Sequence, residues 1–315
     1  MQQALSVHRQ ILKEAWEITW RFKPLWLLGA FASFWATQNI AEAFFNPPLF
    51  SPSSIGGQPM WWQIPSVGGG ISAASLFGLV IGVAIFGFIV WITTASRGGL
   101  ISAVDAASRG KTTSLSQAWT NGTQRFWSIF GISIAGKIIW GSLIFGITCL
   151  AAYVAPRDSV AQSILFSALF ILMVIVALSL TFIINYALSL VMLHGIKPLD
   201  AAVAGTKIFY KNWLLSLEMA VILYGVGILV GITFVAILFV LLMPFMLLWM
   251  ITASLGHMLW FFIFATPAAI LIVAAGITMG AAFTTFQFAA WVLLFKRLMS
   301  GNALAKLIRV FHHPR

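Results

Sequence analysis

Four polar side chains fall inside long apolar stretches of this sequence, where a membrane-spanning helix would carry them. Lys137 and Glu218 can carry opposite charges, and Asn185 and Gln287 can donate and accept hydrogen bonds. A charge within hydrocarbon costs about 2.5–3.5 kcal/mol on insertion scales, so such residues pair with one another or mark a binding site. We therefore expect Lys137 and Glu218 to meet between helices, as a structural ion pair with amide support or as a solute- or lipid-binding site. The alternative for Glu218 is a salt bridge to the lysines that precede its helix.

Other catalytic or metal-binding patterns are missing from the sequence. The 7 acidic residues are scattered, and there is no P-loop, Cys-x-x-Cys or His-Glu-x-x-His motif. We expect no enzyme activity, no metal and no cofactor, because acid–base hydrolysis needs positioned proton-transfer groups at one site. Two readings stay open: His194 or His257 ligating a haem or pigment, and the Asp-Ala-Ala-x-x-Gly strings at Asp105 and Asp200, which approximate the coupling-loop motif of ABC importer permeases.

The composition identifies the solvent in which these residues must act. Hydrophobic residues make up 61% of the 315 residues and charged residues only 8%, whereas soluble domains have roughly 45–50% and ~25%. So few charges exclude a soluble enzyme, a disordered chain and a secreted disulfide scaffold. The single cysteine, Cys149, lies in an apolar run. The sequence therefore predicts an all-α, polytopic membrane protein.

Six stretches are long and apolar enough to span the ~30 Å hydrocarbon layer, which takes about 20 residues in a helix. The predicted spans are Leu25–Phe45, Leu76–Ala95, Trp127–Val154, Ile164–Leu193, Trp213–Trp249 and Pro267–Phe295. Between the last two, Pro244 and Pro267 bracket a polar dip, which we interpret as an interfacial or re-entrant piece. Splitting the fifth stretch would give seven spans.

Basic residues decide between six and seven spans. Lysines and arginines occur before the first span and after the second, fourth and sixth, while the other connections contain only Arg157. This alternation satisfies the positive-inside rule for six spans with both termini in the cytoplasm and places the 46–70 loop outside. The net charge of +11 then reflects orientation and contact with anionic lipid, so we expect no nucleic-acid partner.

An internal repeat organises the chain. Ala118 and Gly122-Thr123 recur in register as Ala201 and Gly205-Thr206, and each copy leads through an aromatic elbow into a span. Residues 1–24 form a looser third copy, with apolar residues from Leu5 to Phe22 on one side and basic residues on the other. Such a helix is expected to lie flat in the headgroup layer. Three helix–elbow–hairpin units would give the single six-span domain over 25–295, followed by a basic tail over 296–315.

The segments Ala95–Val104 (ASRGGLISAV) and Ala118–Ile132, with its Ala-Trp, Gly and Phe-Trp-Ser-Ile-Phe-Gly-Ile elements, resemble bacterial six-span proteins of the glycerophosphoryl diester phosphodiesterase membrane-domain type. The resemblance implies a protein of the bacterial inner membrane. The family is named after an enzyme domain fused to some members, and these 315 residues contain none of its motifs, so its phosphodiesterase chemistry is not transferred.

We therefore expect a non-enzymatic inner-membrane protein that is structural, accessory or lipid-contacting. Its expected partners are the bilayer, anionic headgroups at the cytoplasmic face and other subunits of a membrane complex. The alternative function is a transporter or permease component with a polar site near Lys137 and Glu218.

Overall fold

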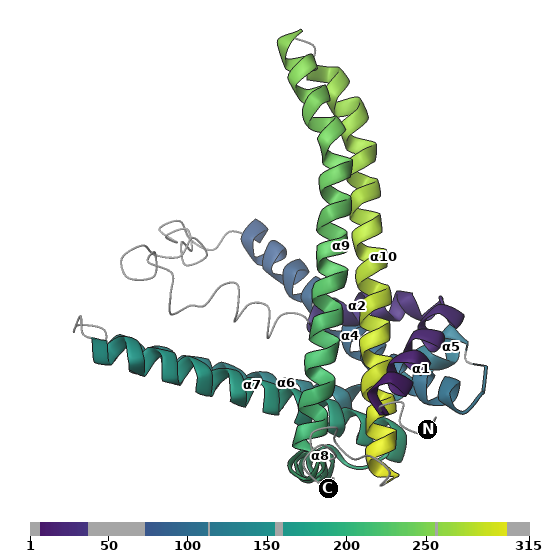
Figure 1. Ribbon diagram of the computed structural model, residues 1–315, viewed down its shortest axis with the longest axis vertical. Helices are drawn as coiled ribbons and strands as arrows, with labels where there is room; N and C mark the ends of the chain where they lie inside the picture. The colour runs from purple at the N-terminus through teal and green to yellow at the C-terminus, as the bar shows by residue number, and fades with distance from the viewer. Residues whose placement is uncertain (1–6, 37–72, 113, 155–159, 256–257, 301–315) are drawn as a thin grey trace, which may run out of the picture. The chain divides into compact units, whose positions relative to one another are not determined.

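A computed structural model describes residues 7–36, 73–112, 114–154, 160–255 and 258–300. Within these ranges the chain forms α-helices and no β-strand (Figure 1), which confirms the all-α prediction for this part of the chain. Three of the short helices, α1, α5 and α8, each end within four residues of the start of the next helix. The helices are α1 Val7–Arg21, α2 Leu25–Ala36, α4 Ala73–Ser108, α5 Leu115–Gln124, α6 Phe126–Val154, α7 Val160–His194, α8 Pro198–Lys211, α9 Trp213–Ser254 and α10 Met258–Met299.

Five of the described helices, α4, α6, α7, α9 and α10, are long and apolar enough to cross a membrane. A soluble protein would bury such helices, yet at most 28% of the residues in the most apolar window of each helix are buried. The chain is therefore a multi-pass integral membrane protein. The first predicted span, Leu25–Phe45, begins in α2 and continues beyond the described residues, and the 46–70 loop lies entirely outside them. Six spans and cytoplasmic termini stay predictions.

The second span ends later than predicted. We expected it to stop at Ala95, before Arg97, but α4 continues to Ser108. Arg97 does not mark the water boundary, because its side chain is buried, with 7% of the residue exposed, and donates a hydrogen bond to Ser133 on α6 at 3.3 Å. Past the helix end, Gly110 has φ +74°, a left-handed conformation that favours glycine.

The interfacial or re-entrant position predicted between Pro244 and Pro267 stays a prediction, but the described residues there do not form a separate segment. Instead, α9 continues through Pro244 to Ser254, and α10 starts at Met258 and passes through Pro267. A helix keeps its backbone hydrogen bonds internal, which apolar surroundings demand, so a proline there kinks a helix more readily than it ends one.

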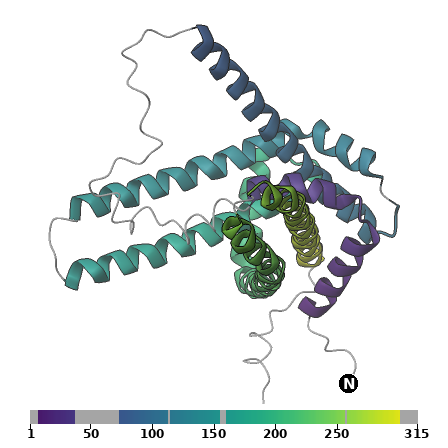
Figure 2. The same ribbon diagram turned by 90° about the horizontal axis from the view of Figure 1, so that it is seen from above.

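The chain divides into two compact units. Unit one comprises Met1–Ser33, Ala103–Leu115 and Asn212–Arg315, and unit two comprises Phe34–Ser102 and Ser116–Lys211. In unit one, α10 packs against both α1 and α9. In unit two, α6 and α7 lie side by side, as Figure 2 shows, and α8 packs against α7. The single membrane domain over 25–295 stays a prediction.

Two glycines of the predicted repeat make the same kind of contact. A methyl group on Gly122 of α5 would overlap the Ala95 carbonyl oxygen of α4, and one on Gly205 of α8 would lie 3.0 Å from the Ile183 carbonyl oxygen of α7. In both places a short helix touches the backbone of the span before it. This shared packing agrees with the sequence similarity of the two copies, while the threefold repeat stays a prediction.

Inside the α9–α10 hairpin, aromatic rings pack against glycines of the facing helix. Gly227 of α9 faces Phe283 of α10, and Gly276 of α10 faces Phe234 of α9, so that each helix supplies one glycine and one ring. Each of these glycines is followed four residues later by a second glycine in the sequence. These second glycines, Gly231 and Gly280, have open space around them.

Candidate functional site

Glu218, one of the four predicted polar residues, lies beside a histidine from the N-terminal helix. It occupies the second turn of α9, and its Oε2 atom is 3.6 Å from Nε2 of His8 on α1. The His8 side chain is 6% exposed and the Glu218 side chain is 15% exposed. The distance is too long for a hydrogen bond, and it makes an ion pair only when His8 carries a proton.

Sequence reasoning missed His8, although a signal was present. His8 precedes Ile11, Ala15 and Ile18 at spacings of three, seven and ten residues, which places it on the same helix face. All four residues are buried. A histidine on the apolar stripe of an amphipathic helix needs a buried polar neighbour, and Glu218 supplies one.

The other three predicted residues are half-buried. Lys137 lies on α6 and Asn185 on α7, both in unit two, whereas Gln287 lies on α10 in unit one. Lys137 and Glu218 belong to different units, and their pairing stays a prediction. The structure brings Glu218 together with His8.

A charged cluster lies where α4 ends. Lys296 of α10 reaches both the Asp105 carboxylate, at 2.9 Å, and the Ser108 hydroxyl, at 2.6 Å. Arg109 pairs with Asp105 from the next helical turn at 3.0 Å. The sequence predicted Lys296 only as one of the basic residues that keep the C-terminal tail in the cytoplasm. In the structure it also ties the end of α10 to the end of α4 within unit one.

Arg125, which lies between α5 and α6, also contacts protein. Its Nη1 donates a hydrogen bond to the Val191 carbonyl near the end of α7. The guanidinium also lies against Gly195, which has φ +69°. A cation at this position interacts favourably with the carboxyl end of the helix dipole.

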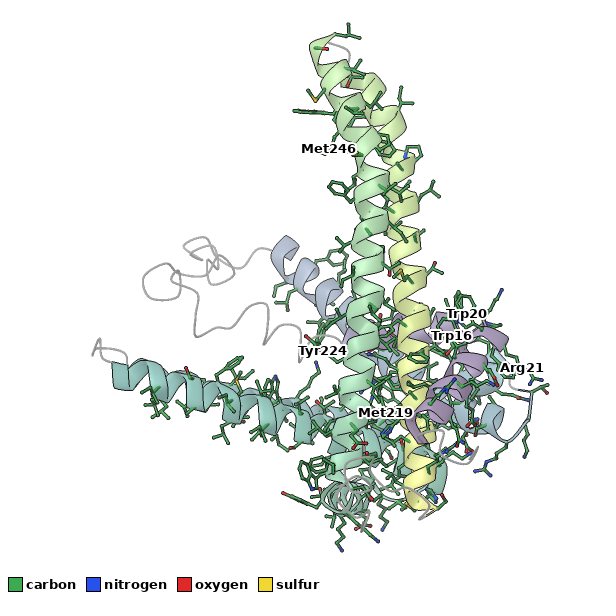
Figure 3. All side chains as sticks on the ribbon, viewed as in Figure 1. Trp16, Trp20, Arg21, Met219, Tyr224 and Met246 are labelled. Atoms are coloured by element: carbon green, nitrogen blue, oxygen red, sulfur yellow. The ribbon has the colours of Figure 1, made fainter. Side chains whose placement is uncertain are left out.

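The apolar face of α1 does not contact lipid as predicted. Its apolar stripe of Ile11, Ala15 and Ile18 is buried, and α1 packs on α10. The stripe therefore contacts protein and not lipid. What α1 exposes is Trp16 and Trp20, which are 56% and 44% exposed (Figure 3).

The tryptophans form an aromatic row. Trp16 and Trp20 have ring centroids 5.3 Å apart, and Trp20 meets Trp26 of α2 edge-to-face at 5.1 Å. Trp26 is fixed in turn by a hydrogen bond from its indole nitrogen to the Thr19 carbonyl at 2.9 Å. Trp16 also contacts Phe286 of α10. The row is thus anchored to the core at both ends.

Two exposed cations accompany the tryptophans. Arg9 and Lys13 lie seven residues before Trp16 and Trp20, respectively, which is close to two helical turns and places all four on one face. Tryptophan rings favour the headgroup level, and arginine and lysine bind phosphate. We call Arg9, Lys13, Trp16 and Trp20 the Trp–cation face. Its chemistry suits an anionic phospholipid headgroup.

Ligation of a haem or pigment by His194 or His257 stays a prediction. Among the described residues, no group of three or more His, Cys, Asp or Glu side chains could hold a metal ion. His194 is the exposed last residue of α7, and His257 lies outside the described ranges.

Comparison of the chain with protein-family models, curated proteins and solved structures found no match. Arguments about function therefore rest on the residues and contacts above.

Proposed function

We propose that this chain is a non-enzymatic, lipid-contacting protein of the bacterial inner membrane, and that the Trp–cation face binds anionic headgroups in the cytoplasmic leaflet. The observation that carries the proposal is the orientation of α1. Its apolar stripe is buried and α1 packs on α10, yet Trp16 and Trp20 remain exposed beside Arg9 and Lys13.

The cost of exposing the tryptophans supports a lipid partner. Aromatic side chains are large, and leaving them in water forfeits about 25 cal/mol for each Å² of apolar surface. At the membrane interface the same rings are stabilised because one edge is apolar and the indole N–H is polar. The cations beside them gain about 1 kcal/mol each at an anionic surface.

A role as a scaffold or a complex subunit is consistent with the spans. Phe77, Val83, Ile85 and Phe88 on the apolar half of α4 are all exposed, and the most apolar window of α9 contains no buried residue. Such surfaces suit lipid tails or other membrane subunits. The family resemblance of the sequence points to the same bacterial setting.

The test measures which lipid surrounds α1. A fluorophore is attached at Leu12→Cys, beside the Trp–cation face, in a Cys149→Ser background. The full chain is reconstituted in phosphatidylcholine vesicles that contain nitroxide-labelled phosphatidylglycerol or nitroxide-labelled phosphatidylcholine. We expect the anionic lipid to quench the label several-fold more strongly at low salt, and the preference to shrink with added salt because exposed charges are screened.

A matched pair of variants isolates the site. Arg9→Gln/Lys13→Gln should abolish the preference, whereas Lys111→Gln/Lys197→Gln removes the same charge from exposed positions elsewhere and should leave it unchanged. Equal quenching by both lipids in the parent protein, or an equal loss in both double variants, would overturn the proposed headgroup site.

A further inference from the structure

The α9–α10 hairpin is longer than a membrane is thick. Each helix has 42 residues, which at 1.5 Å per residue gives a length of about 63 Å. A bilayer has a hydrocarbon core of about 30 Å and measures about 40–45 Å with its headgroups. A tilt of about 40°, the upper end of the usual range, would still leave about 48 Å along the membrane normal.

The excess length cannot lie in water. Between Glu218 and Lys296 the sequence has no Asp, Glu, Lys or Arg. Large apolar side chains are exposed near the far end of α9, on several sides of the helix: Met243, Met246, Leu247, Trp249, Met250 and Ile251. An aqueous hairpin tip of this composition would be strongly disfavoured by the hydrophobic effect.

Two prolines stand at the same height in the hairpin. Pro244 precedes the end of α9 by ten residues, and Pro267 follows the start of α10 by nine. Each proline removes one backbone hydrogen bond and crowds the preceding turn, so each is a site of bending. The upper part of the hairpin leans over near Met246 in Figure 3.

The prolines divide the hairpin into a spanning part and a tip. From Glu218 to Pro244 there are 26 residues, and from Pro267 to Lys296 there are 29, which correspond to about 39 and 44 Å. These lengths equal the full thickness of a bilayer. We define the tip as residues 244–254 of α9 and 258–267 of α10. About 15 Å of helix therefore extends past the spanning part.

We propose that the tip bends at Pro244 and Pro267 and lies in the headgroup–acyl boundary of the leaflet opposite Lys296 and Arg297. Its occupant is lipid and not a protein partner. A partner or a second copy would cover one side of the tip, whereas the exposed apolar side chains of α9 point in several directions, which suits a medium that is apolar on all sides. Trp249, half-exposed within the tip, favours the membrane interface.

Depth measurements test this inference. In a Cys149→Ser background, fluorophores are placed at Met246→Cys in the tip and at Val235→Cys, an exposed position 17 residues beyond Glu218. The full chain is reconstituted in vesicles of phosphatidylcholine and phosphatidylglycerol. Quenching is compared for headgroup nitroxides, nitroxides deep in the acyl chain, and aqueous iodide.

We expect headgroup nitroxides to quench the Met246 label at least twofold more than deep ones, and the Val235 label to show the opposite ratio. Iodide should quench neither label. Pro244→Ala/Pro267→Ala should straighten the hairpin and change the ratio at Met246 by at least twofold, with Val235 unchanged as evidence of a folded span. Pro244→Ala alone, a second variant that keeps one hinge, should give a smaller change. Pro198→Ala, outside the hairpin, is the control.

Three results would overturn the inference. Strong iodide quenching at Met246 would show an aqueous tip, and no quenching by any agent would show a tip covered by protein. An unchanged ratio in both proline variants would show that tilt, and not bending, accommodates the length. None of these results bears on the lipid preference of the Trp–cation face, so the two proposals can fail separately.

Discussion

His8 and Glu218 join α1 to α9, with Nε2 and Oε2 3.6 Å apart and both side chains largely buried. We expect Glu218→Gln to lower the free energy of unfolding by about 1–3 kcal/mol, because the buried His8 would lose the negative charge that faces it. His8→Gln should cost a similar amount, and the double variant less than the sum of the two, as measured by thermal unfolding in detergent. Glu17→Gln breaks an exposed pair with Lys13 and should change stability by less than about 0.5 kcal/mol. Strict additivity of His8→Gln and Glu218→Gln would mean that the contact contributes nothing.

The predicted Lys137–Glu218 pair can be compared with the His8 contact in one experiment. Coupling between two residues appears as a non-additive double-mutant cycle, usually of 0.5–3 kcal/mol. We expect coupling of Glu218→Gln with His8→Gln. If the bundle also brings Lys137 to Glu218, Lys137→Met will couple to Glu218→Gln as well. A cycle that is additive within 0.3–0.5 kcal/mol would reject the pair and leave Asn185 or Gln287 as the next polar groups to test with Lys137.

The cluster at Asp105 should stabilise the end of α10. Asp105→Asn removes the carboxylate that Lys296 contacts at 2.9 Å, and we expect it to lower unfolding stability by about 1–2 kcal/mol. Arg109→Gln removes a partner whose side chain is 57% exposed and should cost less than about 0.5 kcal/mol. The cost of Asp105→Asn should diminish in high salt. An equal effect of both variants would show that Lys296 adds nothing beyond an ordinary helical pair.

Helix contacts made through glycine backbone should not tolerate a methyl group. Gly122→Ala would overlap the Ala95 carbonyl and come within 2.8 Å of the Gly99 nitrogen, and neither backbone atom can move alone. We expect a loss of at least about 2 kcal/mol from overpacking. Gly131→Ala, at a helical position with open space around it, should stabilise the protein by about 0.5–1 kcal/mol through helix propensity. A stable, unshifted Gly122→Ala protein would contradict the described α4–α5 packing.

Topology can be tested with single cysteines in a Cys149→Ser background. A cysteine at Ser54, in the predicted outer loop, should react with a membrane-impermeant maleimide in intact cells. A cysteine at Thr112, just after α4, should react only when the membrane is opened, because basic loops stay in the cytoplasm. The reverse pattern would refute the predicted orientation.

The ends of some helices could be predicted closely, and those of others could not. The predicted spans Trp127–Val154 and Ile164–Leu193 correspond to α6 and α7 within a few residues, because charged and turn-forming residues bound them. The span at Leu76 was predicted to end too early because Arg97 was treated as a sign of water. A charged residue marks the membrane boundary only when no protein group binds it. Arg97 is bound by Ser133, which lies 36 residues further along the sequence.

Pairing between distant helices was beyond sequence reasoning. Periodicity assigned Ile11, Ala15 and Ile18 to one face of α1 but could not say whether that face meets lipid or protein, since both are apolar. The partner of His8 lies 210 residues away in the sequence, and no local pattern encodes a contact over that distance. The prediction of an in-plane helix was thus right about α1 being helical and wrong about what its stripe contacts.

The packing of α1 on α10 also has a consequence for biosynthesis. The chain is made from its N-terminus at roughly 5–20 residues per second, and α10 begins only at Met258. For about 10–50 s after α1 is complete, the helix that will cover Ile11, Ala15 and Ile18 does not yet exist. During that interval the nascent stripe needs a temporary apolar shelter, which the membrane surface beside the translocon can offer. Once α10 has been made, it displaces lipid from α1, so the packing of these two helices forms late in the synthesis of residues 7–299.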